Sequence, residues 1–152
     1  MRQSNSQHYI VRSSSLFGVA GASGKGGNFV ETMIRKARAG EPLRVVNDQV
    51  SSSTLTLDLA DTLHQLAATE RFGLYHVTNS GQTSWHHFAE EIFALMGLRP
   101  SLTTTGSREL AAPARRPLFS VLQNRALMAA GLTPLRPWEE ALKAYLGEKG
   151  HL

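Results

Sequence analysis

The fold is decided by the stretch Tyr9–Ala60, which reads YIVRSSSLFGVAGASGKGGNFVETMIRKARAGEPLRVVNDQVSSSTLTLDLA. An apolar run at its start is followed by a glycine-rich segment, a helical pattern and a second β-branched run, Leu43–Val46, which Asp48 closes. Strand, glycine turn, helix, strand and acid is the order expected of a dinucleotide-binding unit in a parallel sheet. The stretch therefore predicts an α/β fold, and its glycines decide whether a cofactor binds there.

The glycines Gly18, Gly21 and Gly24 fit the spacing G-x-x-G-x-x-G, but their position counts against a phosphate cradle. In a dinucleotide site the first glycine lies in the turn that leaves the strand, so that the pyrophosphate meets the helix N-terminus. Here Ser13–Phe17 separate the strand from the first glycine, and further glycines delay the helix to Asn28. We therefore predict a glycine loop that contains no cofactor-binding residue.

Length and composition predict one globular domain. The chain has 152 residues, of which 41% are apolar and 18% charged, and it contains no cysteine, which excludes disulfides and thiolate metal sites. The net charge is +4, but the basic residues are spread along the chain without a nucleic-acid-binding motif, so we expect no nucleic-acid partner. Neither a membrane-spanning run nor a signal-peptide core is present, so we expect a cytoplasmic protein without a membrane partner.

Apolar patterning predicts the order of the elements. Residues 1–8 are polar and are expected to be disordered, whereas residues 9–152 are expected to form one domain. The predicted strands have the continuous apolar character of parallel strands. The predicted strands are Tyr9–Arg12, Leu43–Val46 and Gly73–Val77, with an extended segment at Thr103–Thr105; the predicted helices are Asn28–Ala39, Leu57–Ala68, Trp85–Met96, Leu127–Gly131 and Trp138–Leu146.

Two of these helices carry predictions about their faces. Asn28 is expected to cap the first helix, whose charged face, including Glu31, should point to solvent. The second helix is expected to turn Leu59, Leu63 and Leu66 towards the core.

Several residue pairs invite a chemical interpretation. Tyr145 and Lys149 have the Tyr-x-x-x-Lys spacing of short-chain dehydrogenases, but they bracket Gly147 close to the last residue. We therefore interpret Tyr145 as a packing residue and predict no catalytic residue in this pair. His86 and His87 lie on adjacent faces of one helix, so they cannot share a metal ion, and no metal site is predicted.

One acidic pair and one basic pair each allow a functional and a structural interpretation. Asp58 and Asp61 could act together as an acid and a base, but acids in the first turn of a helix usually complement its dipole. Arg115 and Arg116 lie in a proline-flanked loop and suit the bidentate recognition of phosphate. A solvated loop explains the same pair equally well.

Six motifs in a fixed order resemble one protein family. They are YIVRSSSLFG (9–18), GNFVETMI (27–34), VVNDQVSSST (45–54), LDLA (57–60), GLYHVTNSGQTSWHHFAEEIF (73–93) and RRPLFSVLQN (115–124). Together they resemble dTDP-4-dehydrorhamnose reductases, which are extended short-chain dehydrogenases, and within them the C-terminal, substrate-binding half. The resemblance runs from Tyr9 to about Leu146.

The resemblance implies both a fold and an activity. The fold would be the last strands of a doubly wound, Rossmann-like parallel sheet plus a small helical substrate-binding lobe. The family reduces dTDP-4-dehydro-L-rhamnose to dTDP-L-rhamnose with NADPH or NADH. Its glycine fingerprint and its catalytic Thr/Ser, Tyr and Lys precede the strand that matches Tyr9–Arg12. The resemblance therefore implies that this chain alone binds no cofactor and is inactive.

Four substrate-binding residues follow from matching positions. Ser15 stands where the family's TSW motif has a Trp that touches the sugar nucleotide. The absence of that Trp removes a large stacking surface. Asn28 and Phe29 match the segment that opens the substrate-side helix. Arg116 matches the arginine of an Arg-Pro pair that borders the substrate cleft. Ser53 departs from the family, which has a proline there.

These observations lead to three hypotheses. The first is a reductase piece that binds the nucleotide-sugar substrate and is active only with a separate N-terminal partner. The second is a non-catalytic module that binds a sugar nucleotide or a protein. The third is a degenerate reading frame without a function. The missing neighbours of the first strand would leave an exposed sheet edge, which predicts self-association, including homo-oligomers.

Overall fold

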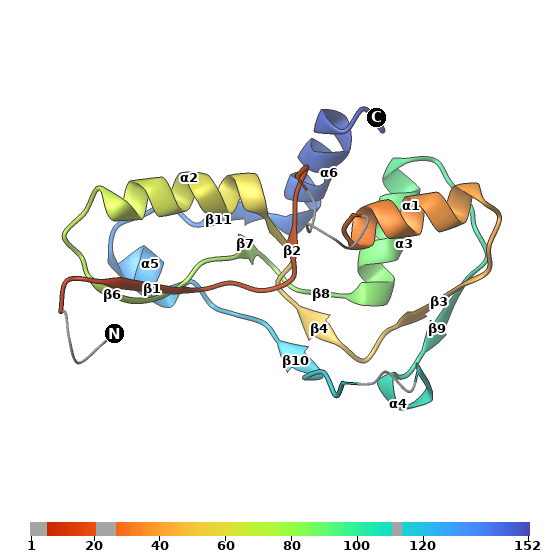
Figure 1. The fold of residues 1–152 in the computed structure, drawn as a ribbon, viewed down its shortest axis with the longest axis horizontal. Coiled ribbons are helices and arrows are strands. Elements are labelled where there is room, and N and C mark those ends of the chain that lie inside the picture. The colour runs from red at the N-terminus through yellow and green to blue at the C-terminus, as the bar shows by residue number, and fades with distance from the viewer. Residues whose placement is uncertain (1–5, 21–26, 111–113) are drawn as a thin grey trace.

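The computed structural model describes residues 6–20, 27–110 and 114–152, which form a mixed α/β fold (Figure 1). The helices are α1 (Phe29–Arg38), α2 (Thr56–Ala67), α3 (Trp85–Leu95), α4 (Ser107–Leu110), α5 (Arg125–Ala129) and α6 (Trp138–Glu148). The strands are β1 (Tyr9–Arg12), β2 (Leu16–Phe17), β3 (Leu43–Val46), β4 (Val50–Ser51), β5 (Thr54–Leu55), β6 (Gly73–His76), β7 (Asn79–Ser80), β8 (Thr83–Ser84), β9 (Leu102–Thr105), β10 (Phe119–Ser120) and β11 (Leu135–Pro137).

One end of the molecule, here called the sheet end, consists of β1, β6, α2 and α5. β1 and β6 pair in parallel from Tyr9 opposite Gly73 to Arg12 opposite His76, which confirms both predicted strands and their direction. Leu66 of α2 and Leu127 of α5 are buried in one cluster with Tyr75 of β6. In the described part of the chain, β1 pairs only with β6, so its outer edge is open.

The other end, here called the helical lobe, consists of α1, α3 and α6 together with β3 and β9. β3 and β9 pair in parallel, which confirms the extended segment predicted at Thr103–Thr105. Side chains from the three helices fill one apolar core around Phe88 and Trp138, whose rings lie 5.5 Å apart. α3 contacts both α1 and α6, and the three helices lie on the same side of the β3–β9 pair in the view of Figure 1. The predicted helical lobe is therefore present.

The lobe helices begin where the sequence predicts. The Asn28 side chain accepts a hydrogen bond from the Glu31 backbone N–H, and the Ser84 side chain accepts one from the His87 backbone N–H. Each cap satisfies a donor that the first turn of a helix otherwise leaves unpaired. Gly40 follows α1 at φ +70°, a conformation that favours glycine, and it ends the helix as expected.

A buried polar layer separates the two ends. Ser52, Ser53 and Thr54 are at most 1% exposed, although serine and threonine side chains are mostly exposed in proteins. Ser52 and Ser53 lie between β4 and β5, and Thr54 is the first residue of β5. The nearby Asn79 side chain accepts a hydrogen bond of 2.8 Å from the Leu55 backbone N–H. Buried polar groups are retained when they are hydrogen-bonded, so this layer joins the two ends without an apolar core of its own.

One face prediction is wrong. Leu63 of α2 is 36% exposed, whereas the neighbouring Thr62 is 7% exposed. The inward stripe runs through Leu59, Thr62 and Leu66, whose spacing follows one face of the helix. Leu63 lies one position beyond that stripe, and its apolar side chain faces outwards.

Two predictions about loops fall partly outside the described residues. Of the N-terminal segment predicted to be disordered, residues 1–5 lie outside the described residues, and the His8 carbonyl accepts a hydrogen bond of 3.0 Å from the Gly73 backbone N–H. The greater part of the glycine loop, residues 21–26, lies outside the described residues as well.

Candidate substrate-binding site

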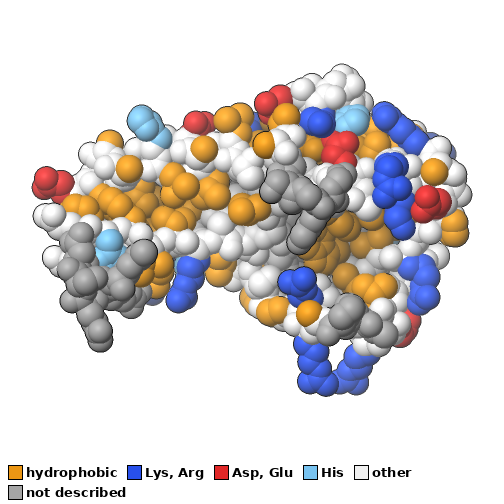
Figure 2. Space-filling model, in the orientation of Figure 1, with side chains coloured by type: hydrophobic (Ala, Val, Ile, Leu, Met, Phe, Trp, Pro, Cys, Tyr) orange, Lys and Arg blue, Asp and Glu red, His pale blue; other side chains and the backbone are white. Residues whose placement is uncertain are grey.

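A cavity of about 490 Å³ lies beside the ends of β3 and β9. Lys and Arg side chains gather at the edge of the molecule where α4 and the segment before β10 lie (Figures 1 and 2). The cavity is lined by Gln49, Ser107, Arg108, Leu110, Ala114, Arg115, Arg116 and Leu118. Its volume falls within the range of about 300–1,000 Å³ that is usual for small-molecule sites.

The topology explains why these residues meet. β3 and β9 are parallel, so their carboxyl ends lie at the same edge, and each strand runs directly into a polar segment. The first segment contains Asp48 and Gln49, and the second contains Ser107. Open α/β sheets bind their ligands outside the carboxyl ends of the strands. The cavity lies at the corresponding edge of the two-stranded β3–β9 pair.

Hydrogen bonds join the two segments. The Ser107 hydroxyl donates to Asp48 Oδ1 at 2.6 Å, and the Ser107 backbone N–H donates to Asp48 Oδ2 at 2.9 Å. The Gln49 amide Nε2 donates to Ser107 Oγ at 2.8 Å. Among the lining residues, Gln49 and Ser107 are half-buried and the others are exposed. The cavity thus combines two positioned polar side chains with a ring of exposed ones.

The charge of the cavity is positive. Arg44, just outside it, is in an ion pair with Glu109 at 3.3 Å. In contrast, Arg108, Arg115 and Arg116 form no ion pair with any carboxylate of the described residues. Three unpaired guanidinium groups around one cavity attract an anion, and the planar fork of arginine suits phosphate oxygens.

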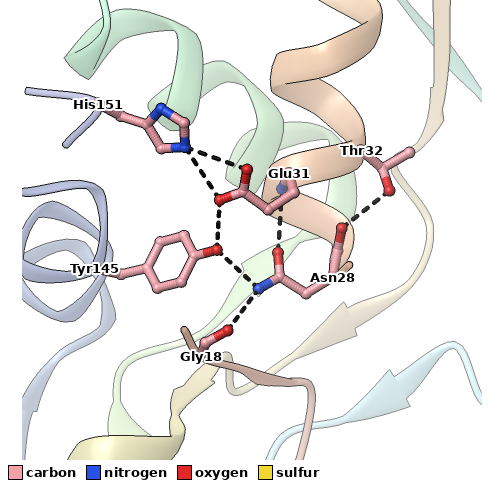
Figure 3. A network of polar contacts seen from close by, with 6 residues as sticks. All are labelled: Gly18, Asn28, Glu31, Thr32, Tyr145 and His151. Carbon is pink, nitrogen blue, oxygen red and sulfur yellow. Dashed lines mark hydrogen bonds and ion pairs between the residues drawn. The ribbon is translucent and has the colours of Figure 1, made fainter. Parts of the chain in front are cut away.

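A second polar cluster ties α1 to α6 (Figure 3). The Asn28 amide Nδ2 donates to the Gly18 carbonyl at 3.1 Å and to Tyr145 Oη at 3.0 Å. Tyr145 Oη donates to Glu31 Oε1 at 2.6 Å, and the His151 ring lies 3.1 Å from the same oxygen. The Asn28 amide is thereby held on both its nitrogen and its oxygen, and it fixes the start of α1 against α6.

Two pKa values reflect this cluster. Burial, followed by the hydrogen bond to the Glu31 carboxylate, raises the pKa of Tyr145 well above its usual value. Burial raises the pKa of Glu31, but the hydrogen bonds from Tyr145 and His151 outweigh it, so the net pKa is lowered. Tyr145 is therefore a neutral, fully buried residue of the core, which agrees with its interpretation as a packing residue. The prediction that Glu31 faces water is wrong, because α6 and His151 cover it.

The four predicted substrate-binding residues do not come together in one place. Arg116 lines the cavity. Asn28 is held in the cluster at the start of α1, and Phe29 packs on Trp85 with ring centroids 4.6 Å apart. Ser15, at φ +44°, donates a hydrogen bond of 2.7 Å to Ser51 Oγ in the polar layer. Their assignment as substrate-binding residues stays a prediction.

The acidic pair has a structural partner. Asp58 accepts two hydrogen bonds from the Arg136 guanidinium, at 2.9 and 2.6 Å, and one from the Asn79 amide at 2.7 Å. Asp61 is exposed. The hydrogen bond to Asp58 is the main cause of the raised pKa of Arg136. Asp58 therefore joins α2 to β7 and β11 and does not form an acid and base pair with Asp61.

Two further kinds of site are absent from the described residues. Residues 6–20, 27–110 and 114–152 contain no group of three or more His, Asp or Glu side chains arranged to hold a metal ion. Over the same ranges, each helix is too short or too polar to cross a membrane.

Sequence reasoning missed Gln49, Ser107 and Arg108 as cavity residues. A signal for them exists, because Gln49 follows β3, Ser107 and Arg108 follow β9, and these two strands pair in parallel. Recognising it requires the pairing of β3 with β9, which are separated by α2, β6 and α3 in the sequence.

Comparison with known proteins gives a consistent result. The family described as the RmlD substrate binding domain matches residues 1–150. A spore coat polysaccharide biosynthesis protein, SpsK, from Bacillus subtilis is 41% identical over 140 residues, which cover 92% of this chain and 47% of that protein. A dTDP-4-dehydrorhamnose reductase from Streptomyces griseus is 44% identical over 140 residues, which cover 88% of this chain and 44% of that protein.

A solved structure agrees with these relatives. The dTDP-4-dehydrorhamnose reductase from Bacillus anthracis, solved in complex with NADP, superposes with a TM-score of 0.85 at 36% identity. The match covers 92% of this chain and 48% of that one. The chain thus spans about half the length of the relatives it matches.

Proposed function

Since this chain belongs to the RmlD substrate binding domain family, we propose that it forms the part of a dTDP-4-dehydrorhamnose reductase that holds the nucleotide-sugar substrate. The reaction would be the NADPH-dependent reduction of dTDP-4-dehydro-L-rhamnose to dTDP-L-rhamnose. This chain would bind and orient the sugar nucleotide, and a cofactor-binding half outside the printed sequence would deliver the hydride.

One observation carries this proposal. The cavity at the carboxyl ends of β3 and β9 is lined by Arg108, Arg115 and Arg116, which have no carboxylate partner among the described residues. A nucleotide diphosphate supplies the negative charge that these side chains lack. Guanidinium groups bind phosphate oxygens in a bidentate manner and discriminate against neutral sugars.

The described residues do not fit a dinucleotide cofactor. β1 is followed by β2 rather than by a glycine turn and a helix, and α1 begins only at Phe29. Gly18 is packed against α2, where an added Cβ would lie 1.9 Å from Thr56 Oγ1, and its carbonyl is bonded to Asn28. This glycine is held by the protein itself and is not presented to a pyrophosphate. We therefore assign no step of the reaction to a cofactor bound by these residues.

The open edge of β1 supports a separate cofactor half. Parallel sheets are normally buried on both faces, yet Tyr9, Ile10 and Val11 are only half-buried. Hydrophobic side chains form a broad patch over α2 and β1 (Figure 2). Leu57, which belongs to α2, is 52% exposed. A parallel strand from the cofactor half would extend this sheet and cover the patch. Pairing of β1 with a second copy of the chain would give a homo-oligomer.

Calorimetry separates the hypotheses. Titration of the purified chain with dTDP-L-rhamnose is expected to give saturable binding, and titration with NADPH is expected to give none. Reductase activity on dTDP-4-dehydro-L-rhamnose should appear only after the cofactor half of a full-length relative is added. Nucleotide-sugar binding without any activity after that addition would favour the non-catalytic binding module instead.

A matched pair of arginine variants locates the binding. Arg116→Gln removes a cavity charge and should weaken dTDP-L-rhamnose binding about tenfold or more, as expected for a lost charge-assisted contact of about 1.5–3 kcal/mol. Arg38→Gln removes an exposed charge at the end of α1 and should leave binding unchanged. Equal effects of the two substitutions would mean that only net charge matters, which contradicts a specific site.

A further inference from the structure

The Gln49 side chain lines the cavity, but an uncharged amide is not needed to bind a diphosphate. It is one of two half-buried lining residues, and it lines the same cavity as Leu110 and Leu118, which are 51% and 56% exposed. A nucleotide offers three chemically distinct parts to such a cavity: anionic phosphates, an apolar ring face and a polar base edge. The arginines suit the first and the leucines the second. An uncharged amide suits the third.

The orientation of the Gln49 amide follows from its neighbours. An ionised carboxylate only accepts hydrogen bonds, so the Ser107 hydroxyl must give its proton to Asp48 Oδ1, 2.6 Å away. Ser107 Oγ is then an acceptor towards Gln49, and the amide group that faces it at 2.8 Å must be Nε2. The amide is therefore locked in one of its two flipped states.

The charge state of Asp48 maintains this lock. Hydrogen bonds from the Ser107 side chain and then its backbone N–H hold the pKa of Asp48 below its usual value. The carboxylate is therefore ionised throughout the neutral range. With the described residues, the Gln49 amide makes only the hydrogen bond to Ser107. Oε1 and the second N–H of Nε2 remain for a ligand.

We propose that Gln49 reads the base of the bound nucleotide and selects a pyrimidine-2,4-dione, thymine or uracil, over cytosine. This inference rests on the proposed function, because it concerns the same cavity and the same class of substrate. The base N3–H donates to Gln49 Oε1, and an adjacent ring carbonyl accepts from Nε2. Ser107 and Asp48 act through Gln49 and are positioning residues.

The lock is what makes this recognition selective. A freely rotating amide presents its donor and acceptor in either order, so it pairs equally well with thymine and with cytosine. When Nε2 is held on Ser107, cytosine in the same pose would place its N3 lone pair against Oε1. A bidentate pair of this kind gives about 1–3 kcal/mol of discrimination between bases, which corresponds to about 5- to 150-fold in affinity.

The test compares four probes on the full chain by calorimetry: dTDP, UDP, CDP and inorganic pyrophosphate. The wild-type chain is expected to bind dTDP and UDP about tenfold more tightly than CDP. Gln49→Leu should bring the three nucleotide affinities together and leave pyrophosphate binding unchanged. Ser107→Ala should unlock the amide, so that CDP binding improves several-fold and dTDP binding changes little.

The outcomes keep this inference separate from the proposed function. Unchanged preference for dTDP over CDP in Gln49→Leu, with pyrophosphate still bound, would overturn base reading by Gln49 and leave the proposed function standing. Absence of binding for all four probes to the folded wild-type chain would overturn both. Weaker binding of every probe in Ser107→Ala, without a gain for CDP, would show that Ser107 merely supports the loop and would overturn the lock.

Discussion

The two ends of the molecule bury apolar surface to very different degrees. In the helical lobe, Phe88, Trp138 and Tyr145 are at most 1% exposed, and three helices enclose them. At the sheet end, Tyr9 and Val11 of β1 are only half-buried, and the outer edge of the strand has no partner among the described residues. The lobe is a closed unit, whereas the sheet end is built to receive further strands. Stability should therefore depend mainly on the lobe, and association mainly on the sheet end.

The sharpest contrast between the ends comes from truncating one side chain in each. Trp138→Ala should lower the free energy of unfolding by about 3–5 kcal/mol, because the emptied volume is enclosed by α3 and α6. Val11→Ala should cost less than about 1 kcal/mol, because the side chain already faces solvent in part. Urea denaturation of both variants measures the difference. Similar losses in the two variants would contradict the contrast.

The ion pair at the start of α2 tests how firmly the sheet end is joined to β11. Asp58→Asn leaves Arg136 without its carboxylate and should lower the free energy of unfolding by about 1–2 kcal/mol, since the 35% exposure of Arg136 reduces the cost of a fully buried pair. Asp61→Asn removes an exposed acid from the same helix and should change stability by less than about 0.5 kcal/mol. Thermal unfolding of the two variants measures the change in Tm that each substitution causes. Equal changes in Tm would show that both acids stabilise the protein only through the dipole of α2.

The cap of α1 allows the lobe to be weakened in two steps. Asn28→Ala removes both the cap and the hydrogen bonds to Gly18 and Tyr145, and it should cost about 1–2 kcal/mol. Asn28→Ser keeps a capping oxygen but loses the hydrogen bonds to Gly18 and Tyr145. Its loss of stability should therefore be about half that of Asn28→Ala. A serine variant as unstable as the alanine variant would mean that the cap contributes nothing.

The smallest effect is a dependence on pH. The folded pKa of Glu31 is lowered, so its contribution to stability is present above the unfolded pKa of about 4.3 and is lost as the pH falls through the folded value. Glu31→Gln should therefore have a lower free energy of unfolding than the wild type at neutral pH. This difference in free energy should become smaller as the pH falls. Glu70→Gln, an exposed control, should show no such narrowing. A gap that stays constant down to the acid transition would contradict the lowered pKa.

Local patterns in the sequence predict most of the elements but not their contacts. Continuous apolar runs predict β1, β3 and β6, and Asn28 and Ser84 mark helix starts that the structure contains. Helical periodicity fits two neighbouring stripes of α2, and the sequence alone does not show which one is covered. In the structure Thr62 is buried and Leu63 is exposed, because the stripe through Leu59, Thr62 and Leu66 faces the cluster around Tyr75.

The candidate site was predictable only in part, for a physical reason. Arg116 could be found from its matching motif, and the structure brings it to the cavity. Gln49 and Ser107 could not, because their proximity depends on a pairing between strands far apart in the sequence. Glu31 was predicted to face water because helical periodicity contains no information about His151, which folds back from beyond the end of α6.

The central claim is that the cavity at the ends of β3 and β9 holds the diphosphate of a nucleotide sugar. Amide chemical-shift mapping during a titration with dTDP-L-rhamnose tests it most directly. We predict that the largest shifts occur at Gln49, at Ser107–Leu110 and at residues 114–118, and that they saturate together. Saturating shifts confined to other parts of the chain, with these residues unmoved, would contradict the claim.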